Sequence, residues 1–135
     1  MMNEADIEKA KIFLINNLKP YLIYLFGSSC TNNFRDDSDI DIAYLSDNES
    51  SDYEIFMLSQ ELADLLRRDV DLIDLKKAST VFKAQVLGGG KVIFCNDDNR
   101  RMYFEMRSLK EYALLNEERK MVLESIKQRG TIYGK

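Results

Sequence analysis

Two aspartates, Asp39 and Asp41, stand two residues apart in a short segment that alternates between acidic and apolar residues. Such alternation is typical of a β-strand, in which side chains two residues apart share one face. Two neighbouring carboxylates repel each other unless a cation lies between them. Carboxylate oxygens suit a hard divalent ion, and Mg²⁺ commonly binds one or two carboxylates together with substrate phosphates. The pair therefore predicts a magnesium site that acts on a phosphorylated substrate.

Gly27 and Ser28 follow the apolar run 22–26 and are separated from the acidic pair by ten residues. The run and the acidic segment predict two strands joined by a loop rich in Asn, Asp and Ser. A glycine lets a phosphate approach the backbone closely, and serine adds a hydroxyl beside free N–H groups. We therefore expect Gly27 and Ser28 to bind the phosphates that the metal bridges.

A third carboxylate is expected from the strand predicted over residues 70–75. Asp71 and Asp74 lie on opposite faces of this strand, and Asp74 shares its face with Val70 and Leu72. If the apolar side chains face the core, Asp71 faces the site and completes a triad with the acidic pair. We favour Asp71 for this reason. Asp74 is the alternative, although we expect it to cap backbone groups of the residues that follow.

The composition predicts one globular domain over residues 1–135, with 45% hydrophobic and 31% charged residues. Within it we expect a catalytic core over residues 1–96 and a C-terminal helix over residues 97–128. The net charge of −4 disfavours direct binding of nucleic acid through phosphate contacts. A nucleotide remains a possible ligand because the metal supplies positive charge.

Several classes of protein are excluded by what the chain lacks. It contains no histidine, which rules out Ser-His-Asp and Cys-His catalysis, and it has neither a Walker A nor a dinucleotide-binding glycine pattern. No apolar run approaches the roughly 18 residues that span a membrane. Cys30 and Cys95 are far apart, and no signal peptide is apparent, so we expect a reduced, cytoplasmic setting.

The elements that must position these residues alternate along the chain. Apolar periodicity, capping residues and turn signals predict four helices and four strands. This order favours an α/β (α+β) fold with a small mixed sheet, helices packed on one face and the carboxylates on the uncovered face. The predicted helices are 3–18, 52–68, 79–87 and 97–128; the strands are 21–26, 39–45, 70–75 and 91–94; and residues 129–135 are a loose tail.

The Gly-Ser pair, ten residues and Asp-x-Asp resemble the signature of the polymerase β-like nucleotidyltransferase superfamily. This chain matches it at Gly27, Ser28, Asp39 and Asp41. Its length is most similar to that of the minimal nucleotidyltransferases, the antitoxin partners of HEPN-domain ribonuclease toxins. The segments 69–75 and 88–94 also resemble that family. The resemblance implies the polymerase β-like nucleotidyltransferase fold.

The resemblance also implies a reaction, the transfer of AMP from ATP to a tyrosine of a cognate HEPN toxin, which is thereby neutralised. Asp39 and Asp41 would bind Mg²⁺ on the triphosphate. Asp71 would bind a second Mg²⁺ beside the acceptor hydroxyl and serve as general base. The expected partners are ATP and the toxin, in a hetero-oligomer.

One segment departs from the family pattern. Members commonly carry Ala-Arg-Gly soon after the Gly-Ser pair, where this chain has Cys30-Thr31-Asn32. Arg35 is the nearest cation and is our candidate for contact with the triphosphate. The altered loop leaves two alternatives open: a non-catalytic antitoxin that blocks the toxin by binding, and a nucleotidyltransferase that modifies a small molecule such as an aminoglycoside.

The start of the predicted C-terminal helix has two interpretations. Met102, Tyr103, Phe104 and Met106 could form a surface for the partner. Alternatively, the two methionines pack in the core, which is the commoner role of such residues.

Overall fold

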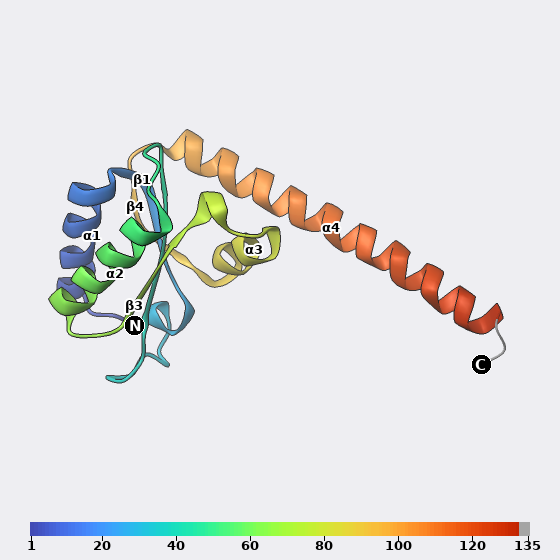
Figure 1. Cartoon of the computed structure of the whole chain (residues 1–135), viewed down its shortest axis with the longest axis horizontal. Coiled ribbons are helices and arrows are strands. Elements are labelled where there is room, and N and C mark those ends of the chain that lie inside the picture. Colours follow the sequence, from blue (N-terminus) through green and yellow to red (C-terminus); the bar gives the residue numbers. More distant parts are fainter. Residues whose placement is uncertain (133–135) are drawn as a thin grey trace.

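The computed structural model describes residues 1–132, with side chains for residues 1–129. These residues form a four-stranded sheet and four α-helices (Figure 1). All eight helices and strands predicted from the sequence are present near their predicted positions. The elements are α1 (Glu4–Leu18), β1 (Pro20–Phe26), β2 (Ile40–Ser46), α2 (Asp52–Leu66), β3 (Val70–Asp74), α3 (Thr80–Gly89), β4 (Lys91–Cys95) and α4 (Asp98–Ile132), with short 3₁₀ turns η1 (Gly27–Cys30) and η2 (Leu75–Lys77).

The sheet is mixed, with strand order β3-β2-β1-β4. The central strand β1 pairs antiparallel with β2 and β4, whereas β2 pairs parallel with β3. A parallel pair needs a crossover connection, and α2 provides it. As a result, the beginnings of β2 and β3 lie at the same end of the sheet as the end of β1. The segments that carry Gly27, Asp41 and Asp71 therefore meet at that end.

Local sequence signals explain where the first two long helices begin and end. Asn3 caps α1 through its side chain, and Ser51 forms a capping box with Glu54 at the start of α2. Both helices end at a residue in the left-handed conformation, Lys19 with φ 46° and Arg67 with φ 57°. Pro20 directly follows Lys19 and begins β1, so the turn between α1 and the sheet is very short.

Helices cover both faces of the sheet, which corrects one part of the predicted arrangement. On one face, α1 and α2 bury the even-numbered side chains of β2, including Ile40 and Ile42. On the other face, Val86 of α3 packs with Tyr24 and Ala43 in a second apolar cluster. The α/β fold class with a small mixed sheet is confirmed. Both faces are covered because β1 is apolar on both sides and each must be removed from water.

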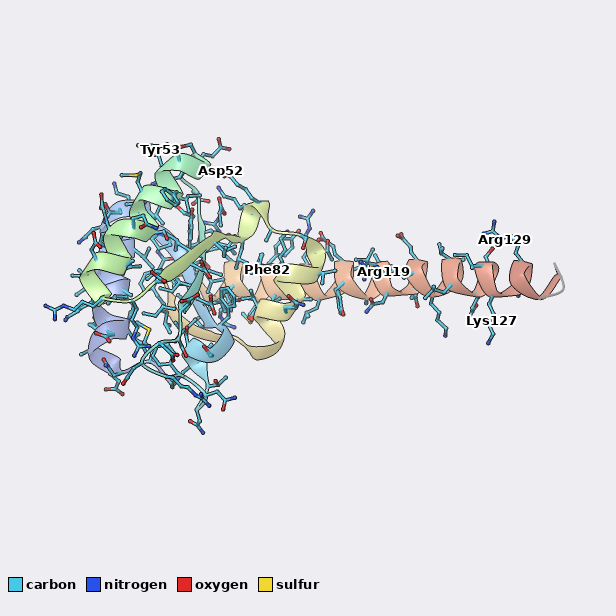
Figure 2. All side chains as sticks on the ribbon, turned by 60° about the horizontal axis from the view of Figure 1, so that its bottom comes forward. Asp52, Tyr53, Phe82, Arg119, Lys127 and Arg129 are labelled. Carbon is cyan, nitrogen blue, oxygen red and sulfur yellow. The ribbon has the colours of Figure 1, made fainter. Side chains whose placement is uncertain are left out.

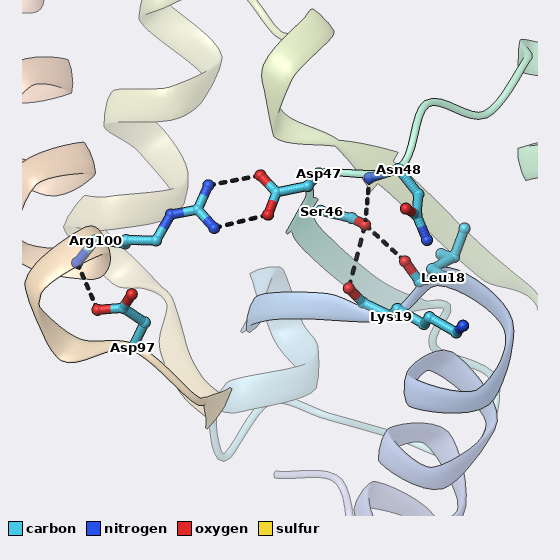
Figure 3. A network of polar contacts seen from close by, with 7 residues as sticks. All are labelled: Leu18, Lys19, Ser46, Asp47, Asn48, Asp97 and Arg100. Atoms are coloured by element: carbon cyan, nitrogen blue, oxygen red, sulfur yellow. Dashed lines mark hydrogen bonds and ion pairs between the residues drawn. The ribbon is translucent and has the colours of Figure 1, made fainter.

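A network of polar contacts anchors the base of α4 to the sheet (Figure 3). The Arg100 guanidinium donates two hydrogen bonds, of 2.7 and 2.9 Å, to the two carboxylate oxygens of Asp47 just after β2. The same guanidinium lies 3.6 Å from the centroid of the Tyr21 ring. Ser46 Oγ donates a 2.6 Å hydrogen bond to the Leu18 carbonyl and so ties α1 to the same corner. These contacts fix the direction in which α4 leaves the sheet.

Beyond this anchor, α4 passes α3 and then projects away from the domain (Figures 1 and 2). It is continuous over 35 residues and extends beyond the predicted end at residue 128. Met102 and Met106 are 52% and 67% exposed, so the interpretation that placed them in the core is wrong, whereas Phe104 packs against the second apolar cluster. Of the predicted loose tail 129–135, residues 129–132 are helical and residues 133–135 lie outside the described residues. None of the described helices is both long and apolar enough to span a membrane.

Candidate active site

Gly27 forms the sharp turn at the end of β1. Its φ of +64° lies in the left-handed region, which glycine adopts at little cost. The chain then enters η1, so the strand direction changes within one residue. A Cβ at this position would collide with Oδ2 of Asp41. The glycine thus allows the turn to lie directly against the acidic strand.

Asp41 and Asp71 are direct neighbours across the parallel pair β2–β3. Their side chains point to the same face, because the alternate residues Ile42 and Leu72 are buried against α1 and α2. Burial raises the pKa of Asp41 to about 6, and the charge of Asp71, a hydrogen bond between the two carboxyl groups and the charge of Asp39 add to the increase. Two carboxylates this close repel each other, so a cation between them would stabilise the site.

Asp39 and Ser28 lie at the margins of this pair. Asp39 immediately precedes β2 and is exposed, and its negative charge contributes to the raised pKa of Asp41. Ser28 is half-buried in η1, next to Gly27. The structure therefore brings Gly27 and Asp41 into contact, with Ser28 and Asp39 next to them in sequence.

Arg35 lies in the exposed loop between η1 and β2, and the Arg68 side chain contacts its backbone. The Arg68 guanidinium donates a 2.5 Å hydrogen bond to the Arg35 carbonyl and lies 4.2 Å from the centroid of the Phe34 ring. The Arg35 N–H donates to Ser38 Oγ at 3.0 Å. Among the described residues, the hydrogen bonds of Arg35 all involve its backbone N–H or carbonyl. Its role in binding phosphate stays a prediction.

Asp74, the alternative third carboxylate, has a structural role. It is 6% exposed, and its side chain accepts a 3.0 Å hydrogen bond from the Lys76 N–H at the start of η2. The predicted capping role is confirmed. Strand alternation separated the two aspartates correctly, because Val70, Leu72 and Asp74 are the buried residues of β3, whereas Asp71 is exposed.

Ser29 contributes to the site in a way that the sequence analysis missed. Its side chain is fully buried, accepts a 2.9 Å hydrogen bond from the Asp41 N–H and donates one of 3.3 Å to the Asp39 carbonyl. One hydroxyl therefore joins the glycine turn to the backbone of both aspartates. A possible signal was the second serine after Gly27, but a serine in a polar loop has many simpler explanations.

We predict that Ser29→Ala destabilises the fold by about 1–3 kcal/mol, because the part-buried Asp41 N–H loses the buried Ser29 hydroxyl as its partner. The acidic strand should also shift relative to Gly27. Urea unfolding checks the first effect, and the midpoint of Mg²⁺-dependent nucleotide binding checks the second. Ser50→Ala is the control, since it removes a hydroxyl from the loop between β2 and α2, at the opposite end of β2 from Asp41. Equal Mg²⁺ dependence in the two variants would show that Ser29 does not position the carboxylates.

The donor set at Asp41 and Asp71 fits a hard divalent cation, because it consists of paired carboxylate oxygens on a rigid sheet. Within the described part of the chain, no group of three or more carboxylate or thiol side chains is placed to hold an ion by itself. Mg²⁺ commonly completes its coordination with water and substrate phosphates. The geometry therefore suits an ion that binds together with a nucleotide.

Residues 8–99 match the protein-family model described as polymerase beta, nucleotidyltransferase. The match spans both strands that carry the predicted signature. This chain belongs to the polymerase β nucleotidyltransferase family. The predicted enzyme class, a nucleotidyltransferase, is thereby confirmed.

Curated and solved relatives agree with this assignment. The chain is 35% identical over 125 residues to the protein adenylyltransferase MntA of Shewanella oneidensis, covering 93% of this chain and 88% of that protein. A chain from a toxin–antitoxin crystal structure with AMP-PNP has a TM-score of 0.80 and 35% identity, covering 89% and 97% of the two chains. A chain from the complex of a tri-AMPylated S. oneidensis HEPN toxin with an MNT antitoxin has a TM-score of 0.79 and 34% identity, covering 93% and 98%.

Proposed function

We propose that this nucleotidyltransferase is an antitoxin that transfers AMP from ATP to a tyrosine of a cognate HEPN-family toxin. The observation that carries the proposal is the pairing of Asp41 with Asp71 directly beside the Gly27 turn. Paired carboxylates next to a phosphate-binding turn are the parts that nucleotidyl transfer needs. The relatives named above are an adenylyltransferase and antitoxins from toxin–antitoxin complexes, one of them with a HEPN toxin, and they support a HEPN-family toxin as the acceptor.

In this reaction the tyrosine oxygen attacks the α-phosphorus of ATP. A new P–O bond forms, the bond between the α-phosphorus and the bridging oxygen breaks, and pyrophosphate leaves. Mg²⁺, when bound, neutralises charge on the phosphates and stabilises the leaving group. The protein's residues would orient the reactants. Gly27 and Ser28 would bind the outer phosphates, Asp39 and Asp41 would hold the ion on the phosphates, and Asp71 would hold a second ion beside the acceptor hydroxyl.

Asp71 is assigned the general base. Asp71 is exposed on the open edge strand β3, whereas its neighbour Asp41 on β2 is half-buried, so an acceptor has access to Asp71. It takes the proton of the tyrosine hydroxyl as the new bond forms. The chain has no histidine to do so.

The test is incubation with labelled ATP and Mg²⁺, with and without the cognate HEPN toxin, followed by peptide mapping. Wild type should label a toxin tyrosine, and Asp39→Ala/Asp41→Ala should not. If neither wild type nor the double variant labels the toxin, and the double variant still neutralises it, the protein acts by binding alone. Transfer to a small hydroxylated compound and not to the toxin would favour the small-molecule alternative.

We also propose that the projecting part of α4 binds the toxin. Beyond residue 115 it carries several large apolar side chains, with Met121 70%, Leu123 66% and Ile126 53% exposed. A helix that extends from its domain gains little stability from propensity alone, and exposed apolar groups of this size mark an interaction surface. Because the relatives named above occur in toxin–antitoxin complexes, the toxin is the expected partner of this surface.

We predict that Leu123→Glu weakens toxin binding about 10- to 100-fold, because it places a carboxylate in an apolar contact. Isothermal titration calorimetry measures the affinity, and thermal unfolding should show an unchanged domain. Glu124→Gln is the control on the neighbouring exposed position. Unaltered affinity of Leu123→Glu would show that the toxin docks elsewhere.

A further inference from the structure

The strand β3 forms one open edge of the sheet, and a cavity of about 380 Å³ lies along it. The cavity runs between the edge strand and α2 and contains Asp71 in its wall. Its other walls are mostly apolar or uncharged side chains from α2 and the segment after β3. We call it the β3 groove, lined by Ile55, Phe56, Ser59, Asp71, Ile73 and Ala78, with Lys77 and Asp52 at one end.

We propose that the β3 groove binds an extended segment of the acceptor protein, which pairs with the free edge of β3 and thereby brings the acceptor hydroxyl to Asp71. This inference rests on the proposed transfer to a protein, and it adds where the acceptor lies and what its sequence must contain. A polypeptide that adds a strand to an open sheet edge gains affinity from main-chain hydrogen bonds and specificity from alternate side chains.

The main chain of β3 has hydrogen-bonding groups available at this edge. The Ile40 N–H donates to the Asp69 carbonyl at 2.8 Å, which shows that the odd-numbered residues of β3 direct their backbone groups toward β2. The even-numbered residues consequently direct theirs toward the open edge. The Val70 carbonyl accepts a 2.7 Å hydrogen bond from Ser59 Oγ. Leu72 lies next along the edge, with its N–H and carbonyl directed at the groove.

The side chains of the groove define what it can accept. Phe56 is 57% exposed although it lies beside buried Ile55, so a large aromatic surface is left open next to the strand. Covering it with an apolar side chain would be favourable. On the opposite face of the strand, Asp71 is a member of the carboxylate pair. The groove therefore continues directly into the candidate active site.

Strand alternation turns this arrangement into a sequence requirement. In a segment paired with β3, successive side chains point to opposite faces. If the acceptor tyrosine is on the Asp71 face, the residues directly before and after it are on the α2 face, against Ile55 and Phe56. These flanking residues should be apolar. They should not be acidic, because an unpaired carboxylate would be buried against Ile55 and Phe56.

The charged side chains that line the β3 groove also favour a polypeptide segment as its ligand. Lys77 Nζ donates to Asp52 at 3.2 Å and to the Ser50 carbonyl at 2.8 Å. Among the described residues that line the groove, Lys77 is the one cation and is already paired, and Asp71 and Asp74 give the remainder a negative charge. Such a surface repels free polyphosphates and accepts a neutral or basic polypeptide.

The test compares Phe56→Ala with Tyr53→Ala, a matched control. Tyr53 is an aromatic residue on the same helix, 71% exposed, and lies outside the groove on the outer surface of α2 (Figure 2). Steady-state AMP transfer to the toxin is measured together with ATP affinity. Phe56→Ala should raise KM for the toxin about tenfold and leave kcat and ATP affinity unchanged. Tyr53→Ala should match wild type. Equal KM values in the two variants would overturn the proposal.

Hydrogen exchange provides a second readout that does not depend on catalysis. Binding of the toxin to wild type should slow exchange of the Leu72 amide, because an added strand would accept its hydrogen bond. If the toxin is never labelled, the proposed transfer fails. Protection of Leu72 would then still support docking at the β3 groove, and unchanged exchange in a formed complex would overturn it.

Discussion

Asp41→Asn should abolish most AMP transfer and yet stabilise the protein in the absence of metal. Activity should fall at least about a hundredfold, because a neutral amide neither binds Mg²⁺ well nor balances charge on the phosphates. The gain in stability has a different origin: burial and the nearby carboxylates raise the pKa of Asp41 to about 6. Ionised Asp41 is therefore costly in the folded state at neutral pH.

The size and pH range of this effect can be stated. Asp41 is only half-buried, so solvent screening reduces the stabilisation to about 1 kcal/mol, or roughly 3–4 °C in Tm for a chain of this length. The folded-state pKa is higher than the ordinary value of 3.8. Stability of wild type consequently falls as the pH rises from about 4 to above 6, and the advantage of Asp41→Asn should vanish at pH 4.

Thermal unfolding at pH 8 with and without Mg²⁺ checks the prediction. In the presence of nucleotide, Mg²⁺ should raise the Tm of wild type and have little effect on Asp41→Asn. Asp37→Asn, which removes one negative charge from the exposed loop, should behave like wild type in both assays. A lower Tm of Asp41→Asn than of wild type without metal would contradict the account in which burial and the nearby carboxylates make ionised Asp41 costly.

Gly27→Ala should reduce both activity and stability, because the added methyl group cannot be placed without moving Asp41. Its Cβ would overlap Asp41 Oδ2, and an alanine with φ near +64° is strained. We expect a loss of about 1–3 kcal/mol in the free energy of unfolding. Transfer of AMP should fall about a hundredfold, since a displacement of about 1 Å at a reacting group has effects of this order.

Gly88→Ala makes the same chemical change where the structure leaves space. Apart from its chain neighbours and the nearby backbone of the same helix, no atom of the described residues lies within 4 Å of a Cβ at this position in α3. Because alanine favours helices over glycine by about 0.8–1.0 kcal/mol, this control should be as stable as wild type or more so. Chemical unfolding and the transfer assay report both quantities. Full activity of Gly27→Ala would show that contact between the turn and Asp41 is not needed.

Much of the fold could be predicted because its signals are local. Capping residues such as Asn3 and Ser51 mark where helices start, and they do so through hydrogen bonds made within one turn. Period-two alternation placed Asp71 and Asp74 on opposite faces of β3. It also fixed the buried side of β2, at Ile40 and Ile42.

The covering of the second face by α3 and the start of α4 was not predicted. The apolar residues of these helices fit any hydrophobic surface, so their spacing does not state which surface they cover. The same ambiguity applied to Met102 and Met106. Helical periodicity identifies an apolar position but cannot tell whether its contact lies in the same chain or in a partner.

The amino-acid sequence by itself determined the types and local order of the reactive groups: Gly27, Ser28, the acidic pair and the orientation of Asp71 on its strand. Tertiary structure alone decided that Asp71 lies beside Asp41, because their pairing depends on the parallel register of β2 and β3 across α2. It also decided that Ser29 holds the turn to the acidic strand. Both contacts join residues at least ten positions apart, and such contacts are set by packing of the whole sheet and not by local propensity.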